Sequence, residues 1–280
     1  MQARNVLSAA AAAAGLLIAA SASNAQLIVG VDDAVNNGEP NLFLIDVTTD
    51  TATALADTFE VWGAAADDPS GILYTNDGST LQTSTYADIA NPTTTTIQSS
   101  AGTALSMVGL AYGDGTLYGI RNIGGDGGAT PEALYAIDPA TGIATVLLDY
   151  AAADFDFGGI DYNPADGLLY ATNDDASPAR GLYSIDPATG AINFVVDYPG
   201  GEVDIDGTAV GDGVVYFVTD EPGDIYRYDI ASGTFLSPLT NPVTGSELFS
   251  AGAWAPGLVP EPTSLALLGL GGLGLLRRRR

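Results

Sequence analysis

The sequence of 280 residues contains no cysteine, no histidine and no lysine. Without cysteine, disulfides and thiol chemistry are excluded. Without histidine, the chain lacks the commonest metal ligand and general base, and it has no serine–histidine nucleophile. Its eight positive charges are all arginine and stand against 34 Asp and Glu, so the formal net charge is −26. Such a chain repels nucleic acid and anionic membrane surfaces, which leaves cations, basic partners and neutral glycans as ligand classes.

The first 25 residues have the features of a secretory signal peptide. Arg4 supplies a positive start, Val6 to Ala20 form an apolar run, and Ser23-Asn24-Ala25 places small residues where a signal peptidase reads them. We predict a signal peptide over residues 1–25, a short helix within it, and cleavage after Ala25. The chain is therefore expected to be exported.

The other end carries a second segment that is unlike the body of the chain. It begins with Val259, Pro260, Glu261 and Pro262, continues with the apolar run Leu265–Leu276, and ends with Arg277, Arg278, Arg279 and Arg280. Twelve helical residues span about 18 Å, against about 30 Å of hydrocarbon in a bilayer. The sequence predicts a short helix that anchors the chain temporarily, with the arginines on the cytoplasmic side.

This combination of Pro-Glu-Pro, apolar run and arginine cluster resembles the PEP-CTERM sorting signal of Gram-negative bacteria, here over residues 258–280. The resemblance implies recognition and processing by exosortase, transient anchoring in the inner membrane, and delivery to the cell surface or extracellular matrix. Hosts of this family typically make extracellular polysaccharide. The membrane is expected to be contacted only through this tail.

A repeat runs through the region between the two end segments. LYAIDPATG at 134–142 recurs as LYSIDPATG at 182–190, with looser copies at 225–233 and 42–50. A second motif contains Tyr74, Tyr118, Tyr170 and Tyr216, which are 44 to 52 residues apart. This period is typical of a propeller blade of four strands. Asp-Pro-Ala-Thr-Gly is a turn sequence, because Asp accepts a nearby N–H, Pro fixes φ and Gly takes the left-handed conformation.

The repeat predicts an all-β fold, a β-propeller of five four-stranded blades over residues 26–257. In the clearest unit the strands are expected at 158–162, 168–172, 181–185 and 191–197. The N-terminal segments 27–33, 42–47 and 51–57 supply only three strands, and the stretch 248–256 supplies the missing one, so both ends share a blade. An open β-sandwich is the alternative. The units resemble those of extracellular β-propeller repeat proteins, a group with mixed functions.

The connections between the second and third strands, and those between blades, are long, irregular and acidic. Irregular loops on a repetitive scaffold are where binding sites usually lie, so we expect the site on this face. Carboxylates are the oxygen ligands that Ca²⁺ prefers. The candidate ligands are Asp32, Asp33, Asp154, Asp156, Asp174, Asp175, Asp204 and Asp206. The alternative is a set of solvated turn carboxylates.

Aromatic residues are a further feature of the expected strands. Trp62 and Trp254 are predicted in innermost strands, and Tyr150, Tyr162 and Tyr198 near strand ends. Aromatic platforms beside carboxylates suit sugar binding, and the alternative is ordinary packing between blades.

These observations favour an exported, non-enzymatic binding module for a glycan or a surface protein, with Ca²⁺ as a candidate cofactor. One alternative is a secreted hydrolase of glycosides or lactones that uses carboxylates such as Asp156 and Asp206. Another is a structural spacer without a ligand. Signal peptidase and exosortase are the processing partners that the end segments imply, and no catalytic residue is assigned.

Overall fold

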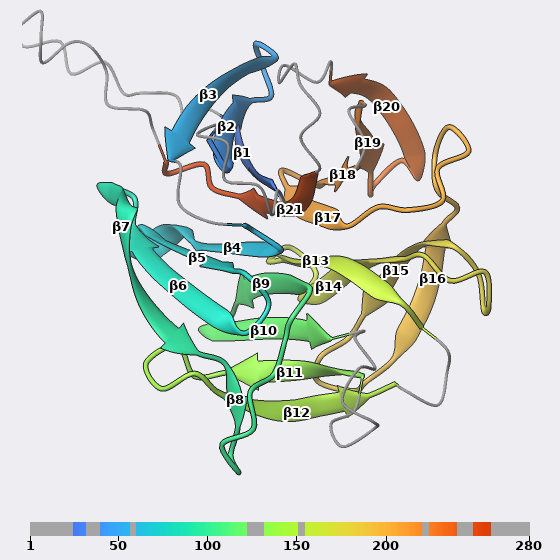
Figure 1. Cartoon of the computed structure of the whole chain (residues 1–280). Helices are drawn as coiled ribbons and strands as arrows, with labels where there is room; N and C mark the ends of the chain where they lie inside the picture. Colours follow the sequence, from blue (N-terminus) through green and yellow to red (C-terminus); the bar gives the residue numbers. More distant parts are fainter. Residues whose placement is uncertain are drawn as a thin grey trace, which may run out of the picture.

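The computed structural model describes residues 25–31, 40–56, 60–121, 132–150, 155–219, 224–239 and 249–258. Within them the chain forms a β-propeller of five blades, arranged radially around a central axis (Figure 1). Each blade is an antiparallel sheet of four strands, and the third blade has one extra short strand. The predicted all-β fold, the blade count and the shared first blade are confirmed. The two predicted terminal helices lie outside the described residues.

The first blade joins the two ends of the domain. It has the order β21 (Phe249–Trp254), β1 (Gln26–Val31), β2 (Leu42–Asp46) and β3 (Thr51–Ala56). Leu27 of β1 lies opposite Trp254 of β21, and Val29 lies opposite Gly252. The innermost strand of this blade therefore comes from the C-terminal end, which closes the ring and removes two open sheet edges.

The other blades follow in chain order. The second has β4 (Gly63–Asp67), β5 (Ile72–Asn76), β6 (Thr80–Thr85) and β7 (Asp88–Thr96), with the short 3₁₀ helix η1 (Asp68–Ser70) between β4 and β5. The third has β9 (Gly109–Gly113), β10 (Thr116–Arg121), β11 (Ala133–Ile137) and β12 (Ile143–Asp149), and β8 (Gln98–Ser99) pairs in parallel with β12.

The fourth blade has β13 (Phe157–Asn163), β14 (Leu168–Asn173), β15 (Gly181–Ile185) and β16 (Ile192–Val196). The fifth has β17 (Gly207–Gly211), β18 (Val214–Val218), β19 (Ile225–Asp229) and β20 (Thr234–Leu239). The innermost strands β4, β9, β13, β17 and β21 surround the axis (Figure 1).

The turns form for local reasons that the sequence contains. In the repeat turns, Asp138 Oδ1 accepts the N–H of Ala140, and Asp186 Oδ1 accepts the N–H of Ala188, each at 2.9 Å. Between β17 and β18, Asp212 and Gly213 have φ of 52° and 78°, the pair of positive values that a type I′ hairpin turn requires. The sequence Gly-Asp-Gly supplies that turn at both Asp114 and Asp212.

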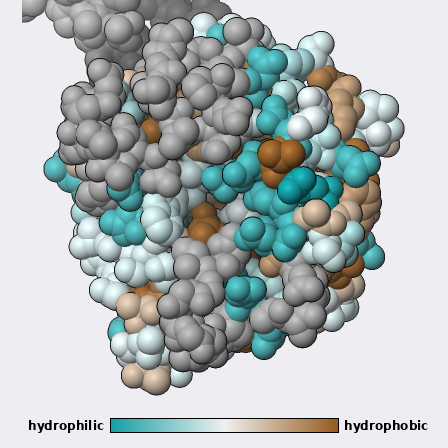
Figure 2. Space-filling view, turned by 45° about the vertical axis from the view of Figure 1, so that its right-hand side comes forward, coloured by the Kyte–Doolittle hydropathy of each residue, from teal (hydrophilic) through white to brown (hydrophobic). Residues whose placement is uncertain are grey.

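The core is divided into five hydrophobic clusters, one between each pair of neighbouring blades. The cluster between the fifth and first blades contains Tyr216 and Val218 from one side and Leu27 and Val29 from the other. Large hydrophobic side chains that are exposed lie mostly on outer strands of the third to fifth blades: Ile143, Val146, Leu147, Phe194, Phe235 and Leu236. On the face seen in Figure 2, hydrophilic (teal) and near-neutral (white) residues cover much of the described surface, and hydrophobic residues are scattered.

The two faces of the ring differ in the connections that they carry. We call the face with the turns between first and second strands the turn face; it carries η1, Asp114–Gly115, 164–167 and Asp212–Gly213. We call the opposite face, which carries residues 77–79 and 174–180, the loop face. Among the described residues, no helix has the length and apolar character needed to cross a bilayer.

Candidate functional site: an axial pocket and an acidic cluster

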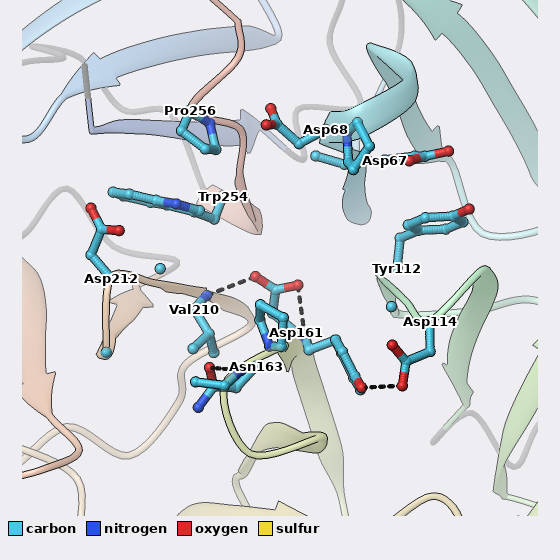
Figure 3. Close-up of a pocket in the computed structure, with 18 of the residues that line it drawn as sticks. Asp67, Asp68, Tyr112, Asp114, Asp161, Asn163, Val210, Asp212, Trp254 and Pro256 are labelled. Carbon is cyan, nitrogen blue, oxygen red and sulfur yellow. Dashed lines mark hydrogen bonds between the residues drawn. The ribbon is translucent and has the colours of Figure 1, made fainter. Parts of the chain in front are cut away.

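A pocket of about 840 Å³ opens on the turn face, at the axis of the ring (Figure 3). Its walls come from the ends of the innermost strands and the turns that follow them, so every blade contributes. The lining residues are 66–69 and 112–115, then 161–165, 210–213, Trp254 and Pro256. This volume is within the range of pockets that hold small ligands. The pocket lies on the face opposite to the one that the loop pattern favoured.

Three aromatic side chains form part of the wall: Tyr112 of β9, Tyr162 of β13 and Trp254 of β21. Each stacks on the repeat tyrosine of the preceding blade. The ring centroids are 5.7 Å apart for Tyr74 and Tyr112, 6.3 Å for Tyr118 and Tyr162, and 5.4 Å for Tyr216 and Trp254. The aromatic residues thus pack between blades and line the pocket at the same time, so the two interpretations from sequence are compatible for Tyr162 and Trp254.

The rim of the pocket is acidic. Asp114 Oδ2 accepts the hydroxyl of Tyr162 at 2.7 Å, and this bond is the main reason that the pKa of Tyr162 rises to about 12. Asp68 Oδ1 accepts the hydroxyl of Tyr86 at 3.1 Å and the N–H of Gly257 at 2.7 Å. Asp212 is exposed at the turn after β17. The hydroxyls of Tyr162 and Tyr86 therefore already donate to carboxylates of the rim.

Asp161 lies at the centre of the pocket floor, between the labelled rim residues in Figure 3. Its Oδ1 accepts the N–H of Tyr162 at 2.8 Å and its Oδ2 accepts the N–H of Val210 at 2.7 Å. The backbone N–H of Trp254 also favours the ionised form of this carboxylate. Burial raises the pKa of Asp161 to about 7, although the three N–H groups act in the opposite direction.

The sequence contains a signal for Asp161 that the repeat search overlooked. In four blades the repeat tyrosine of the second strand lies opposite Ala65, Ala111, Asp161 and Ala209 of the innermost strand. In the first blade Ala253 takes the same position, opposite Ile28. One aspartate among four alanines, on a strand that is buried, marks a residue with a role beyond the repeat.

The lining of the pocket matches the chemistry of a ligand that donates hydrogen bonds. Its acidic lining residues are Asp67, Asp68, Asp114, Asp161 and Asp212, and no arginine is among the described residues that line it. Carboxylates that face a cavity accept from hydroxyl or ammonium groups, and aromatic faces pack on apolar ring surfaces or cations.

Three of the predicted calcium ligands lie together on the loop face. Carboxylate oxygens of Asp174, Asp204 and Asp206 all lie within 4.8 Å of one another. Asp174 Oδ1 accepts the hydroxyl of Tyr198 at 2.8 Å and the N–H of Ile205 at 3.0 Å. Burial, followed by the charges of Asp204 and Asp206, raises the pKa of Asp174 to about 8. Three carboxylate oxygens at this spacing are able to share a hard cation.

Among the described residues, the candidate ligands Asp156 and Asp175 are not in this group. Asp156 belongs to the same loop face, and its N–H donates to Asn173 Oδ1 at 2.8 Å. Asp175 is exposed beside Asp174. Asp32, Asp33 and Asp154 lie outside the described residues. Their membership of a calcium site stays a prediction.

The remaining aromatic candidates lie apart from the pocket. Trp62 directly precedes β4 on the loop face, where its Nε1 donates to Glu60 at 3.3 Å. Tyr150 is buried, donates to the carbonyl of Arg121 at 2.9 Å and contacts Phe157 edge-on. Tyr198 is bonded to Asp174. Tyr150 is therefore a packing residue, while Tyr198 supports the acidic cluster.

Comparison with known proteins identifies the tail. Residues 258–280 match the PEP-CTERM protein-sorting motif. This confirms the resemblance noted in the sequence, and it concerns these residues alone, since they make up a small part of the chain. A search of curated proteins finds no match to the chain.

Solved structures support the fold of the body. A chain in the crystal structure of a nidogen/laminin complex is 12% identical, with a TM-score of 0.56, and the match covers 82% of this chain and 98% of that chain. A glutaminyl cyclase of Myxococcus xanthus matches with 19% identity over 47% of this chain and 59% of that one, at a TM-score of 0.37. The first likeness shows the propeller fold alone, and the second is too low to carry an argument.

Proposed function

We propose that the protein is an exported β-propeller that binds a carbohydrate chain in the axial pocket. The propeller fold and the PEP-CTERM motif fit an exported propeller module. The observation that carries the ligand class is the composition of the pocket, whose described lining combines three aromatic faces with five carboxylates and has no arginine. Sugar rings offer apolar faces to the aromatic rings and hydroxyl donors to the carboxylates.

We also propose that processing at both ends of the chain brings the protein to its location. Signal peptidase removes residues 1–25 after Ala25, and the tail 258–280 anchors the chain in the inner membrane of a Gram-negative host until exosortase processes it. The apolar run Leu265–Leu276 and the four arginines after it support this topology. The final location is the cell surface or the matrix, where polysaccharide is the available ligand.

Binding to an array of extracellular polysaccharides tests the pocket. In Asp114→Asn and Asp212→Asn we expect affinity to fall about tenfold or more, because each change weakens a charge-assisted hydrogen bond of about 1.5–3 kcal/mol. Asparagine tolerates the positive φ of 49° and 52° at these positions, so the turns should persist. Asp186→Asn, in a repeat turn outside the pocket, is the matched control. Unchanged binding in both pocket variants would remove this site.

The calcium prediction is a second proposal, supported by the three grouped carboxylates of Asp174, Asp204 and Asp206. A cation would relieve the repulsion that contributes to the raised pKa of Asp174. Titration calorimetry with Ca²⁺ should give heat in the native chain, and Asp204→Asn or Asp206→Asn should abolish it. Asp175→Asn, an exposed neighbour outside the group, should have no effect. Absence of heat in the native chain would overturn the proposal.

The geometry of the axial pocket favours binding over hydrolysis of a glycoside or lactone. Both oxygens of Asp161 already accept backbone N–H groups, so this carboxylate is held in place and is not aimed at a leaving group. Turnover of a glycoside or lactone panel, lost on Asp156→Asn or Asp206→Asn, would favour hydrolysis over binding.

A further inference from the structure

Both ends of the described domain leave from the turn face, beside the pocket. At the N-terminal end, the carbonyl of Ala25 accepts the N–H of Val47, and the carbonyl of Gln26 accepts the N–H of Ala255, where β21 ends. At the C-terminal end, Gly257 donates to Asp68, a rim residue of the pocket. Leu258, the last described residue, is buried and donates to the carbonyl of Ala255.

The sequence between the domain and the apolar run of the tail is short. Residues 259–264 separate Leu258 from Leu265, where the apolar run begins. An extended chain advances at most about 3.6 Å per residue, so Leu258 lies within about 25 Å of the start of this run. Trp254 and Pro256, which line the pocket, precede Leu258 by only a few residues.

We infer that the uncut tail keeps the domain close to the membrane, with the mouth of the pocket toward the lipid headgroups and the loop face directed outward. This rests on the proposed anchoring of the tail. The acidic rim repels anionic headgroups, so the domain stands off from the bilayer within the reach of its tether. A polymeric ligand is excluded from this gap, and release of the tail opens the pocket. Processing then switches binding on, while the cluster at Asp174 is accessible throughout.

The two tryptophans of the chain report on opposite faces. Trp254 lines the pocket on the turn face, and Trp62 lies on the loop face beside Gly78. Both side chains are partly exposed. Trp62→Phe leaves Trp254 as the sole reporter, and Trp254→Phe, which keeps an aromatic ring on Tyr216, leaves Trp62. If Trp254→Phe fails to fold, the emission of Trp62 is obtained by subtracting the emission of the Trp62→Phe chain from that of the native chain.

The full chain is reconstituted in phosphatidylethanolamine and phosphatidylglycerol vesicles that contain a dansyl-headgroup lipid. We expect stronger energy transfer to the lipid from Trp254 than from Trp62. Equal transfer, or stronger transfer from Trp62, would overturn the orientation. If the chain does not float with the vesicles, the anchoring of the tail is overturned, and this inference with it. The proposal that the pocket binds a carbohydrate would not be affected.

A second measurement tests access to the pocket. A protease site placed after Leu258 releases the domain, and a spin-labelled dextran serves as a neutral polymeric quencher. We expect the quenching of Trp254 to rise at least twofold on release and that of Trp62 to stay constant. Equal quenching of Trp254 before and after release would overturn the exclusion of polymers.

Discussion

At the scale of single residues, Asp161 replaces a small apolar side chain with a buried carboxylate at the axis. Its hydrogen-bond partners come from two blades, because Tyr162 lies on β13 and Val210 lies on β17. Innermost strands have one edge without a neighbouring strand, and their N–H groups need acceptors there. Asp161 meets that need for two strands at once, so it links the fourth and fifth blades as well as forming the floor of the pocket.

Asp161→Ala, which restores the residue of the other blades, should destabilise the fold by about 2–4 kcal/mol, because buried N–H groups lose their acceptor. The free energy of unfolding from urea titration at pH 6 measures this cost. It should shrink at pH 9, because above a pKa of about 7 the folded state holds Asp161 ionised in a buried site, which disfavours the charge relative to the unfolded chain. Asp175→Ala, at an exposed carboxylate, is the control. A cost below about 0.5 kcal/mol would show that water molecules accept from these N–H groups as well as Asp161 does.

At the scale of elements, the glycines that end two innermost strands make room for the aromatic wall. A Cβ at Gly113 would contact the ring of Tyr162, and one at Gly211 would contact the ring of Trp254. The aromatic ring of one blade therefore lies on the glycine of the preceding blade. This contact sets how closely neighbouring blades approach at the mouth of the pocket.

Gly211→Ala should destabilise the fold by about 1–3 kcal/mol, because the methyl group displaces the indole of Trp254 from its stack on Tyr216. In a Trp254→Leu background the same change should cost clearly less, since the added methyl group meets a smaller side chain with no ring. Thermal unfolding of the four proteins in this double-mutant cycle gives the coupling. Additive costs would mean that Gly211 is required for another reason.

At the scale of the whole molecule, the pKa values of some carboxyl groups are raised and those of others are lowered. The two kinds of shift make stability depend on pH in opposite directions. The pKa of Asp161 rises to about 7 and that of Asp174 to about 8, both through burial. The pKa values of Asp138, Asp186 and Asp229 are lowered, the first two mainly by threonine hydroxyls and the third by the N–H of Ser232. The net charge of −26 adds general repulsion once the carboxylates ionise.

Stability should therefore fall as the pH rises from about 4 to about 8, because the folded state binds protons at Asp161 and Asp174 that the unfolded chain has released. It should also fall below about pH 4, where the turn aspartates take up protons in the unfolded chain first. Melting temperatures from pH 3 to 9, with EGTA present, test this. Asp174→Asn should flatten the alkaline slope. A maximum near pH 8 would contradict the raised pKa values.

The sequence alone determined the repeat, the turns, the blade count and the sharing of one blade by both ends. These follow from local chemistry: Asp138 and Asp186 bond to N–H groups two residues away, and Asp-Gly pairs adopt positive φ without outside help. The closure followed from counting, since the N-terminal segments lacked one strand. The tail was readable because its three parts occur in order.

The tertiary structure alone decided where the sites are. Asp161 meets Val210 across 49 residues, and Asp174 meets Ile205 across 31, distances in sequence that no local pattern encodes. Short, repetitive turns looked uninteresting one at a time, yet the ring brings four of them and the end of β21 around one axis and makes a pocket. Since a closed ring places equivalent residues of every blade at a common centre, its function depends on which side chains differ there, and that is visible only once the ring is closed.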